Sequence, residues 1–340
     1  MKRFFIATII SIIALVSLGA CGEKAAPPPS ATVPPTATPP RTATPPPTAD
    51  FSNLAPTHFE RGQLLFGTRD YQDAEARFSE AIRLDHNFSA AYVQRALTRI
   101  RLGLVDEAIA DADRALELEP GNAGAFDAKG LALFNQGLAE DAIRQFDLAI
   151  QADGEFADAY NNRGAAYSGL GQPEVALDDF ATAISLDETY AEAYNNRGTA
   201  YLNLQQPEAA LSDFNRAIEL LPGYTEAHNN RGAAYFSLGN PEQSIIDFDE
   251  ALRLDPESGE TFLYRGAARA QLGIYQGAVE DLTEALRIGV DDAEAHAQRA
   301  LAYTGLELDD EAESDFEQAV TLGVDAATLR SAITEAKSNR

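Results

Sequence analysis

The segment that decides the fold is residues 191–224, AEAYNNRGTAYLNLQQPEAALSDFNRAIELLPGY, and residues 225–258 repeat it as TEAHNNRGAAYFSLGNPEQSIIDFDEALRLDPES. The two segments align without a gap over their whole length, and small residues, aromatic residues and a proline recur at the same places. Within each segment the apolar residues are spaced three and four apart, which is typical of one face of an α-helix. We therefore expect two amphipathic helices per segment, the second beginning at Pro207 in residues 191–224.

The same repeat length holds from Ala55 to Ala326 without insertion or deletion. It divides this stretch into eight repeats, which are 55–88, 89–122, 123–156, 157–190, 191–224, 225–258, 259–292 and 293–326. Residues 327–340 predict a C-terminal capping helix and tail, with Asp325 as the N-cap and Leu329 and Ile333 on its apolar stripe. Because the repeats leave no stretch for a catalytic domain, we expect a protein that is not an enzyme and that needs no cofactor.

Four columns of the alignment predict how the helices pack, with positions counted from the first residue of each repeat. Position 8 is Gly or Ala throughout, position 27 is Ala in all eight repeats, and position 24 is Phe in six. Small side chains let two helices approach closely, and we expect the Phe side chains to fill the space that remains. Position 11 is Tyr in four repeats but Arg99 and Arg269 in two others, where we expect looser packing.

These columns resemble those of the tetratricopeptide repeat family, in which aromatic, small and alanine residues recur at this spacing with a period of about 34 residues. The resemblance covers residues 55–326 and implies an all-α fold, a right-handed superhelical solenoid of eight helix-turn-helix repeats. In this family the first helix of each repeat lines a concave inner face, so the resemblance places positions 2, 5, 6, 9, 12 and 13 there.

The first 54 residues predict a signal that directs the protein to a membrane, followed by a spacer. Residues 1–20 have a basic start and a short apolar run, which is typical of a signal peptide. The run ends in Leu18-Gly19-Ala20-Cys21, which resembles the lipobox of bacterial lipoproteins and implies that Cys21 is lipidated. Residues 21–54 form a linker rich in Pro, Thr and Ala, which is typical of an extended, unfolded segment. The alternative is a secretory leader that contains a buried cysteine.

Composition excludes several classes of function. The net charge is −27, which disfavours nucleic acid as a partner because polyanions repel. One Cys excludes a disulfide framework, and four His leave little for a metal site. Three of these histidines, His58, His228 and His296, occupy position 4, where the other repeats have Tyr or Phe, so we interpret them as core substitutions.

Two polar patterns accompany the repeats. Position 7 is Arg or Lys throughout, and six of these repeats carry Asp at position 23; the Asp residues are Asp111, Asp179, Asp213, Asp247, Asp281 and Asp315. We interpret this pattern as a repeated ion pair between the two helices, in preference to a binding stripe for anions. The sequence leaves open whether each Arg pairs within its own repeat or with a neighbouring one.

The second pattern is a set of asparagine pairs at positions 5 and 6 of three successive repeats: Asn161, Asn162, Asn195, Asn196, Asn229 and Asn230. The resemblance places them on the concave face, where a ladder of amides could bind the backbone of an extended peptide. The alternative is a solvated helix face. Position 2 adds an acidic edge, Asp158, Glu192, Glu226, Glu260 and Glu294. It would favour a basic or neutral ligand, and the alternative is a rim of solvated charges.

The function that we expect is a lipid-anchored scaffold of the bacterial cell envelope, facing outward from the cytoplasmic membrane. It would bind an extended peptide or a protein segment in the concave groove, with membrane residence supplied by the N-terminal lipid. The alternative is an assembly factor for an envelope complex that binds folded subunits through its rims. The sequence does not identify the partner or the oligomeric state.

Overall fold

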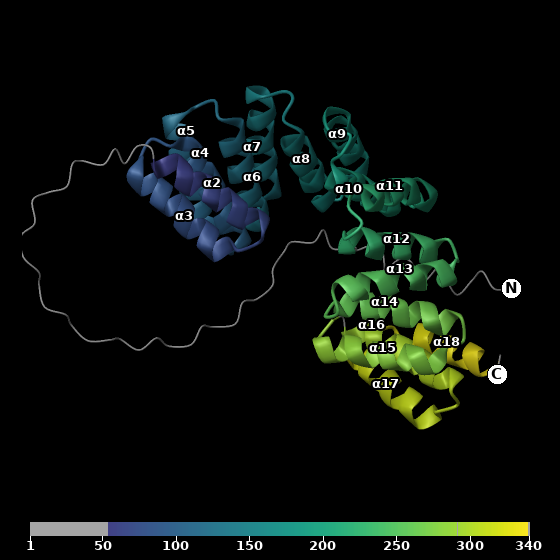
Figure 1. Cartoon of the computed structure of the whole chain (residues 1–340). Coiled ribbons are helices and arrows are strands. Elements are labelled where there is room, and N and C mark those ends of the chain that lie inside the picture. The colour runs from purple at the N-terminus through teal and green to yellow at the C-terminus, as the bar shows by residue number, and fades with distance from the viewer. Residues whose placement is uncertain (1–53, 291, 339–340) are drawn as a thin grey trace, which may run out of the picture. The chain divides into compact units, whose positions relative to one another are not determined.

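The computed structural model describes residues 54–290 and 292–338. Within these ranges every regular element is an α-helix, from α2 to α18 (Figure 1). The helices divide into two compact bodies, residues 54–170 and residues 171–338, which we call the N-terminal and the C-terminal body. The predicted leader, Cys21 and the linker up to residue 53 lie outside the described residues.

The N-terminal body contains seven of the described helices, and each helix packs on the next one along the chain. They are α2 (Leu54–Gly67), α3 (Tyr71–Leu84), α4 (Ser89–Arg101), α5 (Val105–Leu118), α6 (Ala123–Asn135), α7 (Ala139–Ala152) and α8 (Ala157–Gly169). The first helices of successive repeats, α4 with α6 and α6 with α8, are also in contact. This is the helix-turn-helix stacking that the repeat pattern predicts.

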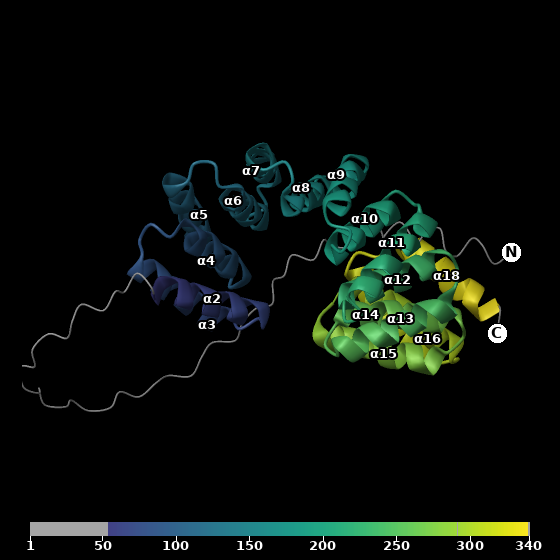
Figure 2. The ribbon, with the colours of Figure 1, turned by 45° about the horizontal axis from the view of Figure 1, so that its top comes forward.

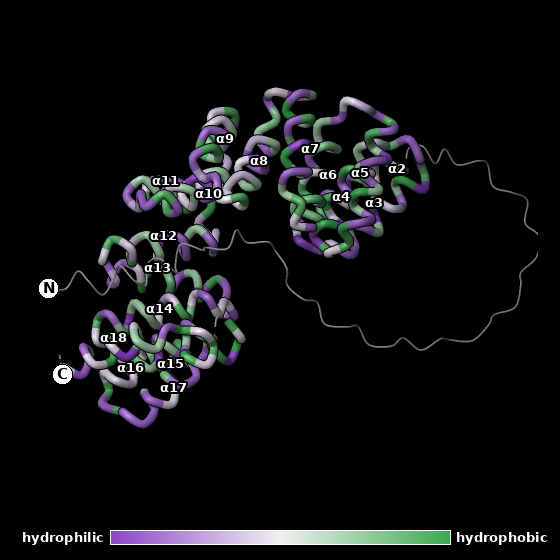
Figure 3. The backbone as a smooth tube through the Cα atoms, turned by 180° about the vertical axis from the view of Figure 1, so that it is seen from behind, coloured by the Kyte–Doolittle hydropathy of each residue, from purple (hydrophilic) through white to green (hydrophobic). Residues whose placement is uncertain are grey.

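The C-terminal body continues the pattern. Its helices are α9 (Pro173–Leu186), α10 (Ala191–Asn203), α11 (Pro207–Leu220), α12 (Thr225–Ser237), α13 (Pro241–Leu254), α14 (Gly259–Gln271), α15 (Tyr275–Ile288), α16 (Asp292–Gly305), α17 (Asp309–Thr321) and α18 (Ala326–Ser338). Each of helices α12 to α17 packs on the next one along the chain, and α12 to α16 lie close together in both views (Figures 1 and 2). Hydrophilic and hydrophobic stretches alternate along the chain, as expected of amphipathic helices (Figure 3).

The turns inside the repeats share one backbone feature that the sequence analysis did not identify. Position 15 adopts a positive φ in every repeat; the residues are Arg69, Gly103, Gly137, Gly171, Gln205, Gly239, Gly273 and Glu307. Glycine adopts this left-handed conformation without strain, which explains its use in five of the eight turns. The second helix then begins at once, with Pro173, Pro207 and Pro241 in its first turn as predicted.

The core confirms the predicted packing of small against large residues. All eight alanines at position 27 are completely buried, and Phe214 is completely buried between α10 and α11. A Cβ atom added at Gly198 would lie only 2.6 Å from Phe214 Cε1, and one at Gly130 would lie 2.5 Å from Phe146 Cε1. In these repeats the absence of a side chain at position 8 lets the phenylalanine ring pack directly on the backbone of the first helix. The last repeat instead pairs Ala300 with Phe316, which is still 8% exposed.

The last helix, α18, closes the C-terminal body in the predicted manner. Leu329 and Ile333 are buried, and the Asp325 carboxylate accepts a hydrogen bond of 2.7 Å from the Thr328 N–H, which caps the helix. The exposed Arg330 reaches back to α17, where its Nη2 donates to Glu313 at 2.6 Å and its guanidinium lies 3.6 Å from the Phe316 ring centroid. The outer face of α18 is polar, as a terminal cap requires.

Candidate functional site

The asparagine pairs all lie on first helices of repeats. Asn161 and Asn162 lie on α8 of the N-terminal body. The other pairs lie in the C-terminal body, Asn195 and Asn196 on α10 and Asn229 and Asn230 on α12. One member of each pair is buried, namely Asn161, Asn195 and Asn230, and the other member is half-buried. The structure therefore divides the six amides into two classes, and the half-buried members are the ones more accessible to a ligand.

Several of these amides link neighbouring first helices. Asn230 Nδ2 donates to Asn195 Oδ1 at 2.9 Å, which connects α12 to α10. Asn162 Nδ2 donates to Asp127 Oδ1 at 2.9 Å, which connects α8 to α6. In both cases position 6 of one repeat donates to position 5 of the preceding repeat. These bonds between repeats are not evident from the sequence, and they hold the side chains in fixed orientations along the first helices.

Asp127 is the one acidic residue at position 5, and it is buried on α6. Burial raises the pKa of its carboxyl to about 7, the hydrogen bond from Asn162 opposes this rise, and the Asp158 carboxylate adds to it. A carboxyl whose pKa is higher in the folded than in the unfolded protein stabilises the fold at low pH. This contribution is lost as the pH rises from about 4 through 7.

Replacing Asp127 with asparagine is expected to increase the free energy of unfolding at pH 8 by about 1–3 kcal/mol, because no buried charge then forms. Three other repeats already carry Asn at this position, so the shape is compatible with the fold. At pH 4 the two proteins should be nearly equal in stability. Urea unfolding from pH 4 to pH 8 measures the difference, and a constant gap between the two curves would contradict the assignment.

The arginine column forms the predicted ion pairs. In five repeats the position 7 guanidinium engages both oxygens of the Asp at position 23 of its own repeat; the pairs are Arg95–Asp111, Arg197–Asp213, Arg231–Asp247, Arg265–Asp281 and Arg299–Asp315. The side chain of each Asp is nearly inaccessible. The hydrogen bond to Asp213 raises the pKa of the Arg197 guanidinium. These arginines support the fold and are not free to bind an anion.

Neighbouring repeats supply a second partner, which answers the question that the sequence left open. The cation at position 7 also bonds to position 25 of the preceding repeat; the pairs are Arg95–Ser79, Lys129–Asp113, Arg163–Asp147, Arg231–Asn215, Arg265–Asp249 and Arg299–Thr283. For Arg197 the corresponding residue is Ala181, which has no acceptor in its side chain. The column thus joins helices within a repeat and also joins successive repeats.

The arginines at position 11 are ion-paired as well. Arg99 Nη1 donates to Asp111 at 2.7 Å, and its Nη2 donates to Glu75 at 2.8 Å. Arg269 Nη1 lies 2.8 Å from Asp281. In these two repeats a second guanidinium binds the buried carboxylate at position 23, where other repeats have an aromatic residue at position 11. The expectation of looser packing rested on the lost aromatic contact alone and did not include this ion pair.

Two histidines at position 4 are core residues in contact with the same aspartates. His296 Nδ1 lies 2.7 Å from Asp315 Oδ1, and His228 Nδ1 lies 3.5 Å from Asp247 Oδ1. His228 Nε2 also lies 3.1 Å from the carbonyl oxygen of Pro222. Within the described residues, no group of three or more His, Cys, Asp and Glu side chains is arranged to hold a metal ion.

The first helices of the C-terminal body present acidic and apolar groups together. Glu192, Glu226 and Glu260 are exposed on α10, α12 and α14, and Phe236 is half-buried on α12. Every arginine on these helices is ion-paired. Asn203, the last residue of α10, has a buried Oδ1 atom without a hydrogen-bond partner. This face therefore offers uncompensated negative charge and an acceptor that the fold does not use.

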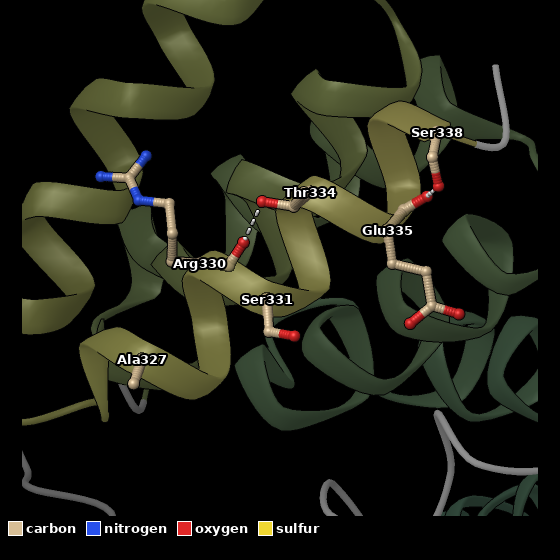
Figure 4. A pocket seen from close by; sticks show the side chains of 6 residues that line it. All are labelled: Ala327, Arg330, Ser331, Thr334, Glu335 and Ser338. Atoms are coloured by element: carbon tan, nitrogen blue, oxygen red, sulfur yellow. Dashed lines mark hydrogen bonds between the residues drawn. The ribbon is translucent and has the colours of Figure 1, made fainter.

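A hollow in the described part of the chain lies on α18, and all of its lining residues belong to that helix. Figure 4 shows that Arg330 points away from Ser331 and Glu335. The Thr334 and Ser338 hydroxyls donate to backbone carbonyl oxygens of the same helix, each at 2.8 Å. The polar groups of this hollow do not point toward one another. No described helix has the length and apolar character needed to cross a membrane.

Paired helices that recur with one constant repeat length define a helical-repeat protein, and comparison of the sequence with family models identifies the family. Models described as "Tetratricopeptide repeat" match residues 59–123, 157–190, 191–224, 225–258 and 293–322. These matches cover more than half of the chain, which therefore belongs to the tetratricopeptide repeat family, as the sequence predicted. No curated protein matches the chain.

Solved structures confirm the fold. A chain of the APC/C hetero-tetramer Cut9-Hcn1 matches with a TM-score of 0.68 and 18% identity over 81% of this chain, which spans only 54% of that one. Pseudomonas aeruginosa pilF matches with a TM-score of 0.56 and 20% identity, covering 64% of this chain and 97% of that one. A tetratricopeptide repeat protein from Parabacteroides merdae gives 0.52 and 20%, over 73% and 98% of the two chains. The fold is that of a scaffold for protein–protein interaction, which is typically non-catalytic.

Proposed function

We propose that the chain binds an extended, basic or neutral peptide segment of a partner protein along the first helices of the C-terminal body. The observation that carries the proposal is the composition of that face. Exposed Glu192, Glu226 and Glu260 recur once in each of three successive repeats, and the arginines of the same helices are already neutralised by aspartates. A cationic or neutral peptide would meet complementary charge there, whereas an acidic one would be repelled.

The amides supply the polar part of recognition in this proposal. Asn229 is half-buried, and its Oδ1 is held by the Thr261 hydroxyl at 3.2 Å, which orients the amide. Asn203 Oδ1 has no partner within the fold, and a rotation of this half-buried side chain would let it accept a backbone N–H of the ligand. Because these side chains belong to packed helices, little conformational entropy is lost on binding.

The double variant Asn203→Ala, Asn229→Ala tests whether the partner binds along the first helices of the C-terminal body. Each lost hydrogen bond is worth about 0.5–1.5 kcal/mol, so partner binding should weaken about tenfold. Stability should fall by no more than the single bond from the Thr261 hydroxyl to Asn229, about 0.5–1.5 kcal/mol, because Asn203 Oδ1 makes no bond within the fold. Asn240→Ala is the matched control, since Asn240 lies in an exposed turn of the same body and makes no capping bond. Partners captured from the native envelope extract by the parent would be quantified against both variants, and equal retention would exclude the groove.

A second candidate, an assembly factor that binds folded subunits through outer surfaces, has one observation in its favour. Ile246 on the second helix α13 is 60% exposed, whereas the same position is polar or alanine in the other repeats. An Ile246→Ser variant included in the same capture experiment separates the two candidates. Loss of the partner in this variant alone would move recognition to the second helices.

We propose further that Cys21 carries a lipid that holds the protein on a bacterial membrane, facing outward. The support is the lipobox-like sequence that ends at the only Cys of the chain. A Cys21→Ser variant is expected to move from the membrane fraction to the soluble fraction after carbonate washing. The net charge of −27 disfavours direct adsorption to anionic lipid, so a variant that remained on the membrane would argue against this anchor.

A further inference from the structure

In two repeats the Asp at position 23 contacts both the His at position 4 and the Arg at position 7, and we call this group of three side chains a cage. In the last repeat, Arg299 Nε donates to Asp315 Oδ2 at 2.7 Å, and His296 Nδ1 lies 2.7 Å from Asp315 Oδ1. The repeat of residues 225–258 has the same set, with His228 and Arg231 around Asp247. In both, position 4 is His, position 7 is Arg, and a single buried carboxylate satisfies both side chains.

The first repeat keeps the two donors but lacks the carboxylate. Its residues at the same three positions are His58, Arg61 and Arg77, so that a guanidinium replaces the aspartate. The hairpin of α2 and α3 has the same close approach as the others. A Cβ atom at Gly62 would lie 2.6 Å from Phe78 Cε1, compared with 2.7 Å for Gly232 and Phe248. His58 and Arg61 lie on α2 and Arg77 on α3, the two helices that meet at Gly62 and Phe78, so the three residues occupy the positions that surround Asp247 in its repeat. Arg61 is exposed, and His58 and Arg77 are half-buried.

Within the described residues these three side chains have no anionic partner. His58 Nδ1 is buried and makes no hydrogen bond, and neither Arg61 nor Arg77 forms an ion pair. In six other repeats the residue 16 positions before the position 7 cation supplies an acceptor, but for Arg61 that residue is Pro45, which has no acceptor in its side chain.

Two carboxylates of α3 near this place, Glu75 and Glu80, are engaged by other arginines, whereas Asp73, one turn before Arg77, is exposed. Glu80 acts electrostatically with both His58 and Arg77, but its two oxygens accept bonds of 2.6 and 2.7 Å from Arg83. Glu75 is held by Arg99 at 2.8 Å. The first repeat thus carries two arginines and an unsatisfied imidazole at the positions that hold an arginine, a histidine and their shared carboxylate in the repeats of Asp247 and Asp315.

We propose that His58, Arg61 and Arg77 form a binding site for a small oxyanion, a carboxylate or a phosphate, which takes the place of the missing aspartate. A guanidinium binds both kinds of oxyanion through two parallel N–H donors, and charge-assisted bonds of this type are the strongest that side chains form. The imidazole Nδ1 would donate the third bond in the tautomer that places its proton there. The site lies between the first and second helices of one hairpin, apart from the face that the peptide proposal uses.

The test is a titration of the full chain with sodium acetate and with sodium phosphate, at an ionic strength held constant with sodium chloride. The readout is the imidazole signals of His58 in NMR spectra, assigned by a His58→Gln variant. We expect a saturable shift of the His58 signals, with the other three histidines unmoved. A response to acetate identifies a carboxylate site, and a response to phosphate alone identifies a phosphate site.

The decisive variant is Arg77→Asp, which restores the carboxylate that the other cages contain. Because the internal Asp would occupy the site, binding should weaken at least about tenfold, and the melting temperature in chloride should rise. Arg69→Asp is the matched control, since it makes the same charge change at an exposed turn of the same repeat and should leave binding intact. No saturable shift in the parent, or an equal shift in Arg77→Asp, would overturn the proposal. Should Arg77→Asp fail to fold, Arg77→Gln removes one of the two guanidinium groups without supplying a carboxylate, and binding of the anion should then weaken because one donor is lost.

Discussion

Replacing Phe214 with alanine is expected to lower the free energy of unfolding of the C-terminal body by about 3–5 kcal/mol. The ring is completely buried between α10 and α11, and it packs directly on the backbone at Gly198. Alanine would remove the contacts of the ring and leave a cavity that the paired helices can close only in part. Urea unfolding followed by circular dichroism measures the loss.

A double-mutant cycle with Gly198 identifies the cause of the loss. Gly198→Ala alone should cost about 1–3 kcal/mol, because its Cβ would fall 2.6 Å from Phe214 Cε1. The double variant reproduces the pair Ala96 and Ala112, which the repeat of residues 89–122 already uses. We therefore expect the double variant to lose less stability than the sum of the single ones. Strict additivity would show that the two residues do not share the space that the structure assigns to them.

The repeat register and its packing could be predicted because they depend on residues close in sequence. Pro207 begins α11 and Leu220 ends it, as expected from the spacing of apolar residues and from the proline. The alanines at position 27 are buried because one helix pair cannot close without them. The periodicity of the sequence reflects these local requirements directly. Eight copies of the pattern were therefore sufficient to predict the bounds of the helices and their packing within a repeat.

Features that depend on the rotation of one repeat against the next could not be predicted in the same way. The hydrogen bond from Asn230 to Asn195 joins residues 35 apart, and only the stacked helices show that position 6 meets position 5 of the preceding repeat. The bond from Arg265 to Asp249 is of the same kind. One signal for it was present in the sequence, since position 25 is polar in seven of eight repeats and is alanine only at Ala181.

Arg265 forms two ion pairs, one with Asp281 and one with Asp249. Replacing the Asp by Asn should lower the stability of the fold by very different amounts in the two cases. The Arg265 guanidinium donates to Asp281, whose side chain is 3% exposed, and also to Asp249, whose side chain is 51% exposed. Asp281→Asn should cost about 3–5 kcal/mol, because it leaves the charges of Arg265 and Arg269 without their shared carboxylate. Asp249→Asn should cost no more than about 1 kcal/mol, because water solvates both partners when that bond is lost.

Salt separates the two effects further, since ions screen an exposed pair far more than a buried one. Raising the sodium chloride concentration from about 0.05 to 1 M should abolish most of the small effect of Asp249→Asn while the effect of Asp281→Asn persists. Urea unfolding of the parent and both variants at the two salt concentrations provides the comparison. The arginine is the same in every measurement, so the difference between the variants reports the burial of the carboxylate. Equal losses for the two would mean that the column at position 7 acts through surface charge, and the interpretation of buried Asp281 as the structural partner would have to be abandoned.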